Sequence, residues 1–161
     1  MIRVLFVCLG NICRSPLAEG LFKKKIIERG IEDQFFVDSA GTSDYHIGEL
    51  PDQRTLKIAA KYGIRINHRG RQVSPRDFKN FDYILAMDES NLQNLKKVQG
   101  SELMSDEEML LIRSIQEKPD SLSVPDPYYG GEQGFENVFE ILNDSTDKLL
   151  DKILAEHPSH A

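Results

Sequence analysis

Short apolar runs alternate along this chain with segments in which apolar residues recur at helical spacing. The runs at 2–7, 35–39 and 82–87 predict buried strands. Helices are expected at 16–29, from Pro51 to a stop at Gly63, after Asp88 through Val98 and across 135–153, and Ser74 with Pro75 predicts the start of another short helix. Residues 156–161 are expected to form a frayed tail.

This alternation predicts the fold class. Parallel strands need long crossover connections, which here are helices. We therefore expect an α/β fold of three layers, in which an open twisted sheet of about four parallel strands is flanked by helices on both faces, as in flavodoxin-like or Rossmann-like proteins. Residues 1–161 are expected to form a single domain. Ligands of such sheets bind at the carboxyl ends of the strands, and the first strand ends at Cys8.

The stretch from Ser101 to Ile115 fits two kinds of structure. Residues 105–108 fit the capping box of a helix, whereas residues 109–112 fit a buried strand. We favour the strand.

The connection from Cys8 to Pro16 has the form of an anion-binding loop. A strand, a loop containing Gly and Asn, and a helix N-terminus direct backbone N–H groups at one point. A thiol beside a helix N-terminus and a fixed cation is favoured as a thiolate nucleophile, which makes Cys8 a candidate. Arg14 can bind two oxygens of a tetrahedral oxyanion, and Ser15 can donate a hydrogen bond to the thiolate. A structural cysteine beside an unrelated surface arginine is the weaker interpretation, because Gly, Ser and Pro also occupy the positions that such a loop needs.

The charge balance restricts the ligands. The 161 residues include 26 acidic and 20 basic side chains, a net charge of −6, so a broad nucleic-acid-binding surface is not expected and an anion site has to be local. The apolar run after Met1 is too short for a signal sequence or a membrane span. We expect a cytoplasmic protein that binds neither nucleic acid nor membranes.

Cys8 and Cys13 are too few for a disulfide framework or a four-thiolate metal site. Two hypotheses for Cys13 carry equal weight: a reversible disulfide with Cys8 that protects the nucleophile from overoxidation, or a side chain that fills space under the loop. His68 fits a structural hydrogen-bonding role better than metal ligation, because no further ligands cluster with it in the sequence. We expect no metal and no other cofactor.

A thiolate that attacks a phosphate ester needs a partner that protonates the leaving oxygen and later activates water. Asp126 is the candidate, because Pro125 and Pro127 stiffen its loop. The neighbouring Tyr128 and Tyr129 can wall a pocket for an aromatic ring. An Asp between prolines is more often a turn residue, and only the loop with Cys8 and Arg14 favours a catalytic role.

With these residues in place, the chain resembles the low molecular weight protein tyrosine phosphatases. The matching segments are 4–16, 38–43, 63–64, 81–92 and 126–130, whereas 96–123 matches less well and its secondary structure stays open. The resemblance implies Cys8 as nucleophile, Arg14 as the clamp on phosphate and transition state, Ser15 as the partner of the thiolate, and Asp126 as general acid and then base.

Further roles are also implied by the resemblance. Asn11, Ser39 and His68 would hold the loop backbone, Asp88 would orient Arg14, and Cys13 matches the redox partner of the nucleophile. The positions that match the substrate cleft are Leu9, Ile12, Tyr45, Tyr128 and Tyr129. The phosphate oxygens would be held by Arg14 and by the loop amides of Leu9, Gly10, Asn11, Ile12, Cys13 and Arg14.

The leading hypothesis is metal-independent hydrolysis of phosphotyrosine and other aryl phosphates through a cysteinyl-phosphate at Cys8, with inorganic phosphate as product and inhibitor. One alternative is a thiol-dependent arsenate reductase on the same fold, although that chemistry needs relay cysteines beyond Cys13, which the chain lacks. The other is a non-catalytic oxyanion-binding or redox-sensing module that uses Cys8 and Cys13. Whether the substrate is a tyrosine phosphoprotein, an arginine phosphate or a small ester is left open, as is the oligomeric state.

Overall fold

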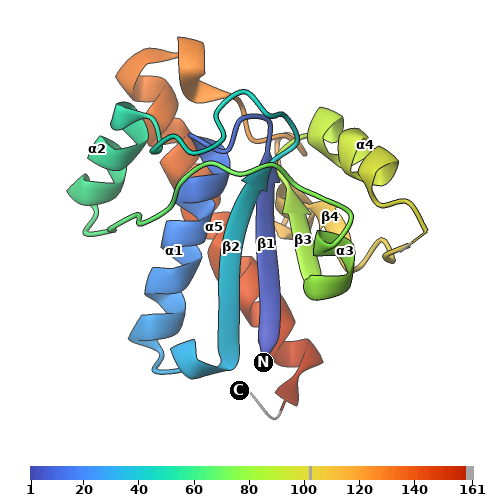
Figure 1. Cartoon of the computed structure of the whole chain (residues 1–161). Coiled ribbons are helices and arrows are strands. Elements are labelled where there is room, and N and C mark those ends of the chain that lie inside the picture. The colour runs from blue at the N-terminus through green and yellow to red at the C-terminus, as the bar shows by residue number, and fades with distance from the viewer. Residues whose placement is uncertain (102, 159–161) are drawn as a thin grey trace.

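A four-stranded parallel sheet forms the centre of the protein in this computed structural model, which describes residues 1–101 and 103–158 (Figure 1). The strands are β1 Ile2–Cys8, β2 Phe35–Gly41, β3 Tyr83–Ala86 and β4 Met109–Leu111. Their order is β2-β1-β3-β4, and each neighbouring pair is parallel. The predicted α/β fold is confirmed.

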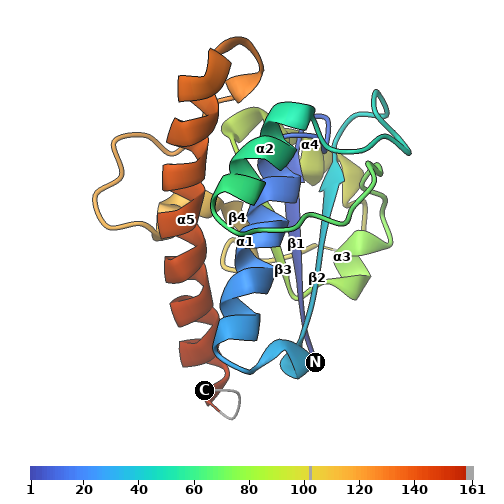
Figure 2. The same cartoon turned by 90° about the vertical axis from the view of Figure 1, so that its left-hand side faces the viewer.

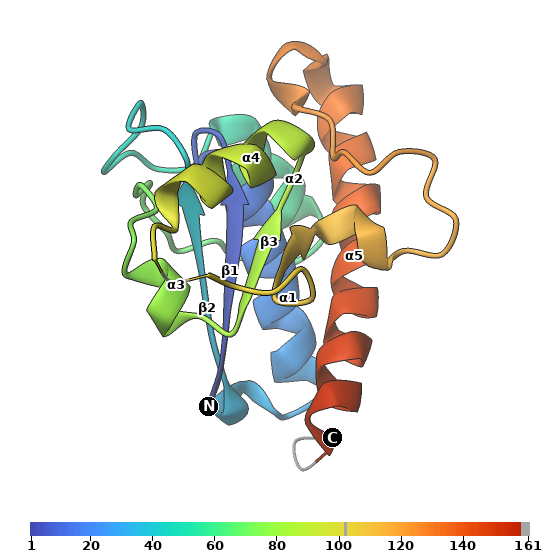
Figure 3. The ribbon, with the colours of Figure 1, turned by 90° about the vertical axis from the view of Figure 1, so that its right-hand side faces the viewer.

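Helices cover both faces of the sheet (Figures 2 and 3). One face carries α1 Arg14–Glu28, α2 Gln53–Lys61 and α5 Gly131–Glu156, and the other carries α3 Asp77–Asn80 and α4 Glu89–Val98. Short 3-10 turns, η1 Glu32–Gln34, η2 Ile112–Ile115 and η3 Pro127–Tyr129, complete the connections. Among the described residues, no helix combines the length and apolar character that crossing a membrane requires.

The side chains of β1 divide between two cores, because successive residues of a strand point to opposite faces. Val4 and Phe6 pack with α1 and α5, whereas Leu5 and Val7 pack with α3, α4 and the apolar side chains of β3. All four are fully buried, and β1 is one of the two interior strands of the sheet. Its last residue, Cys8, is therefore delivered at a rigid position.

Local hydrogen bonds move several boundaries from their predicted places. Helix α1 begins at Arg14 rather than Pro16, because the carbonyl of Cys13 already accepts from the N–H of Leu17 at 3.3 Å. Strand β2 runs through Gly41 instead of turning at residue 40, because Gly41 still pairs with Cys8. Helix α2 begins at Gln53, and its N-cap is Asp52, whose carboxylate accepts from the N–H of Arg54.

Helix α3 also starts later than predicted. Ser74 and Pro75 belong to the preceding turn, in which the carboxylate of Asp77 accepts from the N–H of Ser74 at 2.8 Å. At the other end of the chain, Glu156 is the last residue of α5 and accepts from the hydroxyl of Tyr83 at 2.6 Å. The expectation of fraying from residue 156 is therefore wrong at its start, and residues 159–161 lie outside the described part of the chain.

The strand favoured within 101–115 is confirmed as β4. Before it, Ser105 donates through its hydroxyl to the Glu108 carboxylate at 2.9 Å. This pair resembles half of a capping box, but it closes a turn that leads into a strand.

Candidate active site

The anion-binding loop predicted from Cys8 to Pro16, from here on called the phosphate loop, lies between the end of β1 and the start of α1, where the carboxyl edge of the sheet meets a helix N-terminus. Cys8 is its first residue and is 3% exposed. The chain turns back at Asn11, which has a φ of 59°, a left-handed conformation that Asn tolerates better than most residues. As a result, the N–H of Asn11 points at the sulfur of Cys8, 3.3 Å away.

Ser15, in the first turn of α1, is the second neighbour of the Cys8 sulfur. Its Oγ lies 3.0 Å from Sγ and also accepts from Nδ2 of Asn11 at 2.8 Å. The carbonyl of Ala40 is 3.5 Å from the same hydroxyl, a longer contact than the one with sulfur. The Ser15 proton is therefore best placed to stabilise a thiolate at Cys8.

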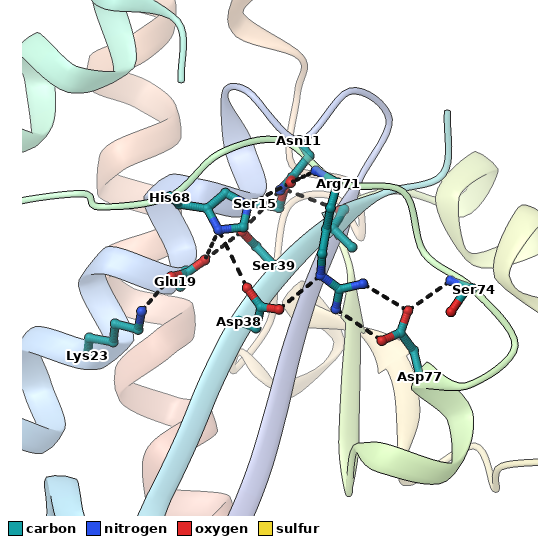
Figure 4. A network of polar contacts seen from close by, with 11 residues as sticks. Asn11, Ser15, Glu19, Lys23, Asp38, Ser39, His68, Arg71, Ser74 and Asp77 are labelled. Atoms are coloured by element: carbon teal, nitrogen blue, oxygen red, sulfur yellow. Dashed lines mark hydrogen bonds and ion pairs between the residues drawn. The ribbon is translucent and has the colours of Figure 1, made fainter. Parts of the chain in front are cut away.

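A polar network behind the loop fixes Asn11 (Figure 4). Its Nδ2 also donates to Ser39 at 3.0 Å, and its Oδ1 accepts from Nε2 of His68 at 2.7 Å and from the N–H of Arg71 at 3.0 Å. An amide oxygen can only accept, so Nε2 of His68 is the donor. The three residues that the resemblance linked to the loop backbone, Asn11, Ser39 and His68, are thus brought into direct contact.

The network continues through residues that the sequence analysis did not single out. Ser39 donates to the buried carboxylate of Glu19 at 2.6 Å, and Glu19 also pairs with Lys23. Arg71 donates to Asp38 at 2.9 Å and to both oxygens of Asp77. Burial lowers the pKa of Arg71, but the two carboxylates outweigh burial and raise it overall.

Glu19, Asp38 and His68 also bring one metal-ligand atom each within 4.8 Å of one another. Lys23 and Arg71 already balance the charge of the two carboxylates, and Nδ1 of His68 faces both carboxylates, 3.3 Å from Glu19 and 3.5 Å from Asp38. These ion pairs and hydrogen bonds account for the cluster as a support for the phosphate loop.

Arg14 is 3% exposed and reaches the site from the first turn of α1. Its Nη1 donates to the Asp88 carboxylate and to the carbonyl of Val124, both at 2.8 Å. Asp88 is itself fixed, because it caps α4 and accepts from the N–H of Asn91 at 2.8 Å. With both of these bonds on Nη1, the other guanidinium nitrogens are available to an oxyanion.

Asp126 lies in the loop before η3 and is exposed to solvent. It is the N-cap of η3, and its Oδ1 accepts from the N–H of Tyr128 at 3.0 Å. Pro125 and Pro127 fix the backbone on both sides. One carboxyl oxygen is thus engaged by the backbone, and the other can serve a ligand.

A single cleft of about 310 Å³ joins these groups. The residues that line it are Cys8, Leu9, Gly10, Ile12, Cys13, Arg14, Tyr45, His46, Asp126 and Tyr128. Four of the five positions matched to the substrate cleft are among them, and the side chain of the fifth, Tyr129, lies outside the described part of the structure. His46 is an addition: a Cβ on Gly10 would come within 2.9 Å of its ring, so the imidazole packs directly on the phosphate loop.

Comparison with known proteins places the chain in a family. The family model "Low molecular weight phosphotyrosine protein phosphatase" matches residues 3–159. The chain belongs to this family. A family member of that name from Schizosaccharomyces pombe is 46% identical over 155 residues, which cover 94% of this chain and 97% of the relative. The human protein of the same name is 44% identical over 137 residues, which cover 85% of this chain and 86% of the relative.

Solved structures give the same result. YfkJ from Bacillus subtilis superimposes on this low molecular weight phosphatase with a TM-score of 0.90 at 40% identity. The superposition covers 97% of this chain and 96% of YfkJ. The protein titled DARP, drosophila arginine phosphatase, superimposes with a TM-score of 0.86 at 35% identity, covering 94% of this chain and 98% of its own.

Cys13 of this phosphatase lines the cleft and is 7% exposed. Burial raises the pKa of its thiol to about 12, against a smaller opposing effect of Thr55. Both cysteines are free thiols in the structure. The structure therefore places Cys13 in the same cleft as Cys8, both as free thiols, which is compatible with both hypotheses for the role of Cys13.

Proposed function

We propose that this phosphatase hydrolyses phosphotyrosine and related aryl phosphates through a cysteinyl-phosphate intermediate. The observation that carries the proposal is the joint access of the Cys8 thiol, the Arg14 guanidinium and the Asp126 carboxyl group to one cleft of about 310 Å³. A nucleophile, an oxyanion clamp and a proton donor are the three groups that the reaction needs. Tyr45 and Tyr128 give this cleft aromatic walls suited to a phenyl ring.

In the first step, the Cys8 thiolate forms a bond to phosphorus as the bond from phosphorus to the tyrosyl oxygen breaks. Asp126 transfers its proton to that oxygen, so that a phenol leaves rather than a phenolate. The amides of residues 9–14 and Arg14 hold the three other phosphate oxygens and stabilise charge that develops in the transition state.

In the second step, Asp126 removes a proton from water as the water oxygen bonds to phosphorus and the sulfur–phosphorus bond breaks. Ser15 stabilises the departing thiolate, because its hydroxyl lies 3.0 Å from the sulfur. Inorganic phosphate is released and, as a ligand of the same loop, acts as a product inhibitor.

The test is an assay of phosphotyrosine with a thiol reductant and a metal chelator. The wild-type protein is expected to turn over, Cys8→Ser to lose activity, and Asp126→Asn to hydrolyse phenyl phosphate about two to four decades more slowly, the usual range for general acid–base catalysis. Asp126→Asn should also accumulate phosphate on Cys8, detectable by intact-protein mass spectrometry. Near-normal activity of Cys8→Ser, or strict dependence on an added metal, contradicts the proposal.

Phosphoarginine is the second candidate substrate, because one structural neighbour is titled an arginine phosphatase. The aromatic walls favour phosphotyrosine, and the ratio of the two kcat/KM values measured on one preparation decides between them. We also infer a cytoplasmic location, because the reaction needs Cys8 as a free thiol and a reducing compartment maintains it.

A further inference from the structure

The segment that carries Asp126 has little packing of its own. Residues 116–126 contain no helix or strand, and Figures 2 and 3 show the segment standing away from the body of the protein beside α5. A hollow of about 470 Å³ separates it from Asn137, Glu140 and Ile141 of that helix. Leu122 is exposed, whereas Val124, near the end of the segment, is buried in the core. Apolar burial therefore holds the segment at Val124 but not between residues 116 and 123.

Arg113, in η2, supplies the missing anchor. It is only 6% exposed, because the surface segment covers it. Its Nε donates to the side-chain oxygen of Gln116 at 2.8 Å, its Nη1 to the carbonyl of Ser123 at 2.9 Å, and its Nη2 to the Asp120 carboxylate. One planar guanidinium thus binds three points of the same segment, which an ammonium group cannot reproduce.

The backbone inside this clamp is strained. Lys118 has a φ of 47°, an uncommon conformation for a residue other than glycine, and it precedes Pro119. Gln116 and Asp120, on either side of this turn, are both acceptors of Arg113. A strained turn persists only where its surroundings enforce it, so the Arg113 fork and the Lys118 conformation belong together.

Next to the clamp, the chain is fixed from the active site. Val124 donates its N–H to the carbonyl of Met87 at 2.8 Å and accepts from Arg14 through its own carbonyl at 2.8 Å. The consecutive carbonyls of Ser123 and Val124 are therefore bound by two different arginines, Arg113 and Arg14. Pro125 then links this doubly bound peptide to Asp126 with a fixed φ.

We propose that Arg113 is a positioning residue for the general acid: by holding the carbonyl of Ser123, it directs the Asp126 carboxyl group to the leaving-group side of the cleft. The inference rests on the proposed function, in which Asp126 protonates the leaving oxygen. It predicts that loss of Arg113 impairs proton transfer specifically, and leaves phosphate binding and attack by Cys8 in place. A displacement of about 1 Å at such a group can cost about a hundredfold in rate.

The test compares aryl phosphates whose leaving groups differ in basicity. Phenyl phosphate needs its leaving oxygen protonated, whereas 2,4-dinitrophenyl phosphate releases a stable anion without help. For Arg113→Met we expect kcat/KM to fall about ten- to a hundredfold with phenyl phosphate and less than about threefold with the dinitrophenyl ester. Inhibition of Arg113→Met by inorganic phosphate should be unchanged. The kcat/KM of Arg113→Lys with phenyl phosphate should lie between the values of wild type and Arg113→Met.

Two further variants calibrate this comparison. Asp126→Asn should show the strongest dependence on leaving-group basicity, and if it shows none, the general-acid assignment itself is wrong, whatever Arg113 does. Arg29→Met removes an exposed, ion-paired arginine at the far end of α1 and should leave both esters unaffected. An equal loss on both esters, or none, in Arg113→Met overturns the proposal. If that variant does not fold, the same two-ester ratio in Arg113→Lys decides.

Discussion

Nε2 of His68 donates a hydrogen bond to the side-chain oxygen of Asn11 at 2.7 Å, and so ties the segment after α2 to the turning point of the phosphate loop. Asn11 is in a left-handed conformation and uses its amide group for four hydrogen bonds. The loop is thus held from behind in the shape that an oxyanion needs, before any ligand arrives.

Replacing His68 with Ala is expected to lower both stability and activity. The loss leaves a cavity and removes one of two donors to Asn11, and removal of a buried hydrogen-bond partner costs about 1–3 kcal/mol. Urea unfolding should show this decrease, and kcat/KM should fall with every ester alike. Lys57→Met removes an exposed ion pair with Glu132 that lies outside this network, so it is the control and should change the free energy of unfolding by less than about 0.5 kcal/mol.

Ser15→Ala should slow the second chemical step more than the first. The hydroxyl stabilises negative charge on sulfur, and a hydrogen bond to a charged group contributes about 1.5–3 kcal/mol, or about ten- to a hundredfold in rate. Rapid-mixing measurements with p-nitrophenyl phosphate should show a burst of phenol followed by slow turnover. Ser145→Ala, at another buried helical serine, should behave as wild type. An equal slowing of both steps contradicts this role of Ser15.

Asp88 has two separable functions, as cap of α4 and as partner of Arg14. Asp88→Asn keeps a good N-cap but loses the charge that orients the guanidinium, so stability should be retained while kcat/KM falls about tenfold. Asp88→Ala should lose the same activity and also about 1 kcal/mol of stability. Thermal unfolding together with kinetics distinguishes the two variants, and a fully active Asp88→Asn refutes the orienting role.

Ionisation of the Cys13 thiol should lower the free energy of unfolding at alkaline pH. Burial raises the pKa of its thiol from 9.0 to about 12, so the folded protein holds this proton more tightly than the unfolded chain. The resulting stabilisation is complete below pH 9 and is lost as pH rises toward 12. Between pH 8 and pH 10.5, the free energy of unfolding measured under reducing conditions should therefore fall more in wild type than in Cys13→Ala. If the free energy of unfolding of wild type and of Cys13→Ala falls equally over this pH range, Cys13 does not contribute to the pH dependence.

The sequence was most informative where function constrains several residue types at once. Cys8 and Arg14 could be selected because a thiol at a strand end and a guanidinium at a helix start occur together in one loop, and that loop in turn favoured Asp126 over the commoner turn role of an Asp between prolines. The fold was predictable for a similar reason, because buried parallel strands produce unbroken apolar runs.

Asn11, Ser39, His68 and Asp88 were expected to support the loop, but Glu19 and Arg113 escaped prediction because in the sequence they look like ordinary surface residues. Glu19 lies four residues before Lys23 in a helix, the usual pattern of an exposed ion pair, and only the packing of α1 against β2 shows that it is buried. Arg113 falls in a segment without clear periodicity, and its three acceptors are side chains and a carbonyl that only the folded chain brings together.

Element boundaries were missed by one to four residues for a different reason. Pro51 and Ser74 were expected to start helices, but α2 begins after its N-cap Asp52, and α3 begins after Arg76, whose side chain makes no capping hydrogen bond. The hydrogen bonds of the folded chain decided which residue starts each helix. That choice depends on three-dimensional geometry rather than on local composition.

The bond between Arg14 and the carbonyl of Val124 links residues 110 positions apart. During synthesis on the ribosome, the phosphate loop therefore emerges long before the peptide that completes the Arg14 clamp and the carboxyl group that follows it. A nascent chain that ends before residue 124 has the proposed nucleophile but neither this tie nor the proposed proton donor. On the proposed mechanism, full phosphatase activity is thus acquired only with the last quarter of the chain, and a prematurely terminated product lacks two of the groups that the reaction uses.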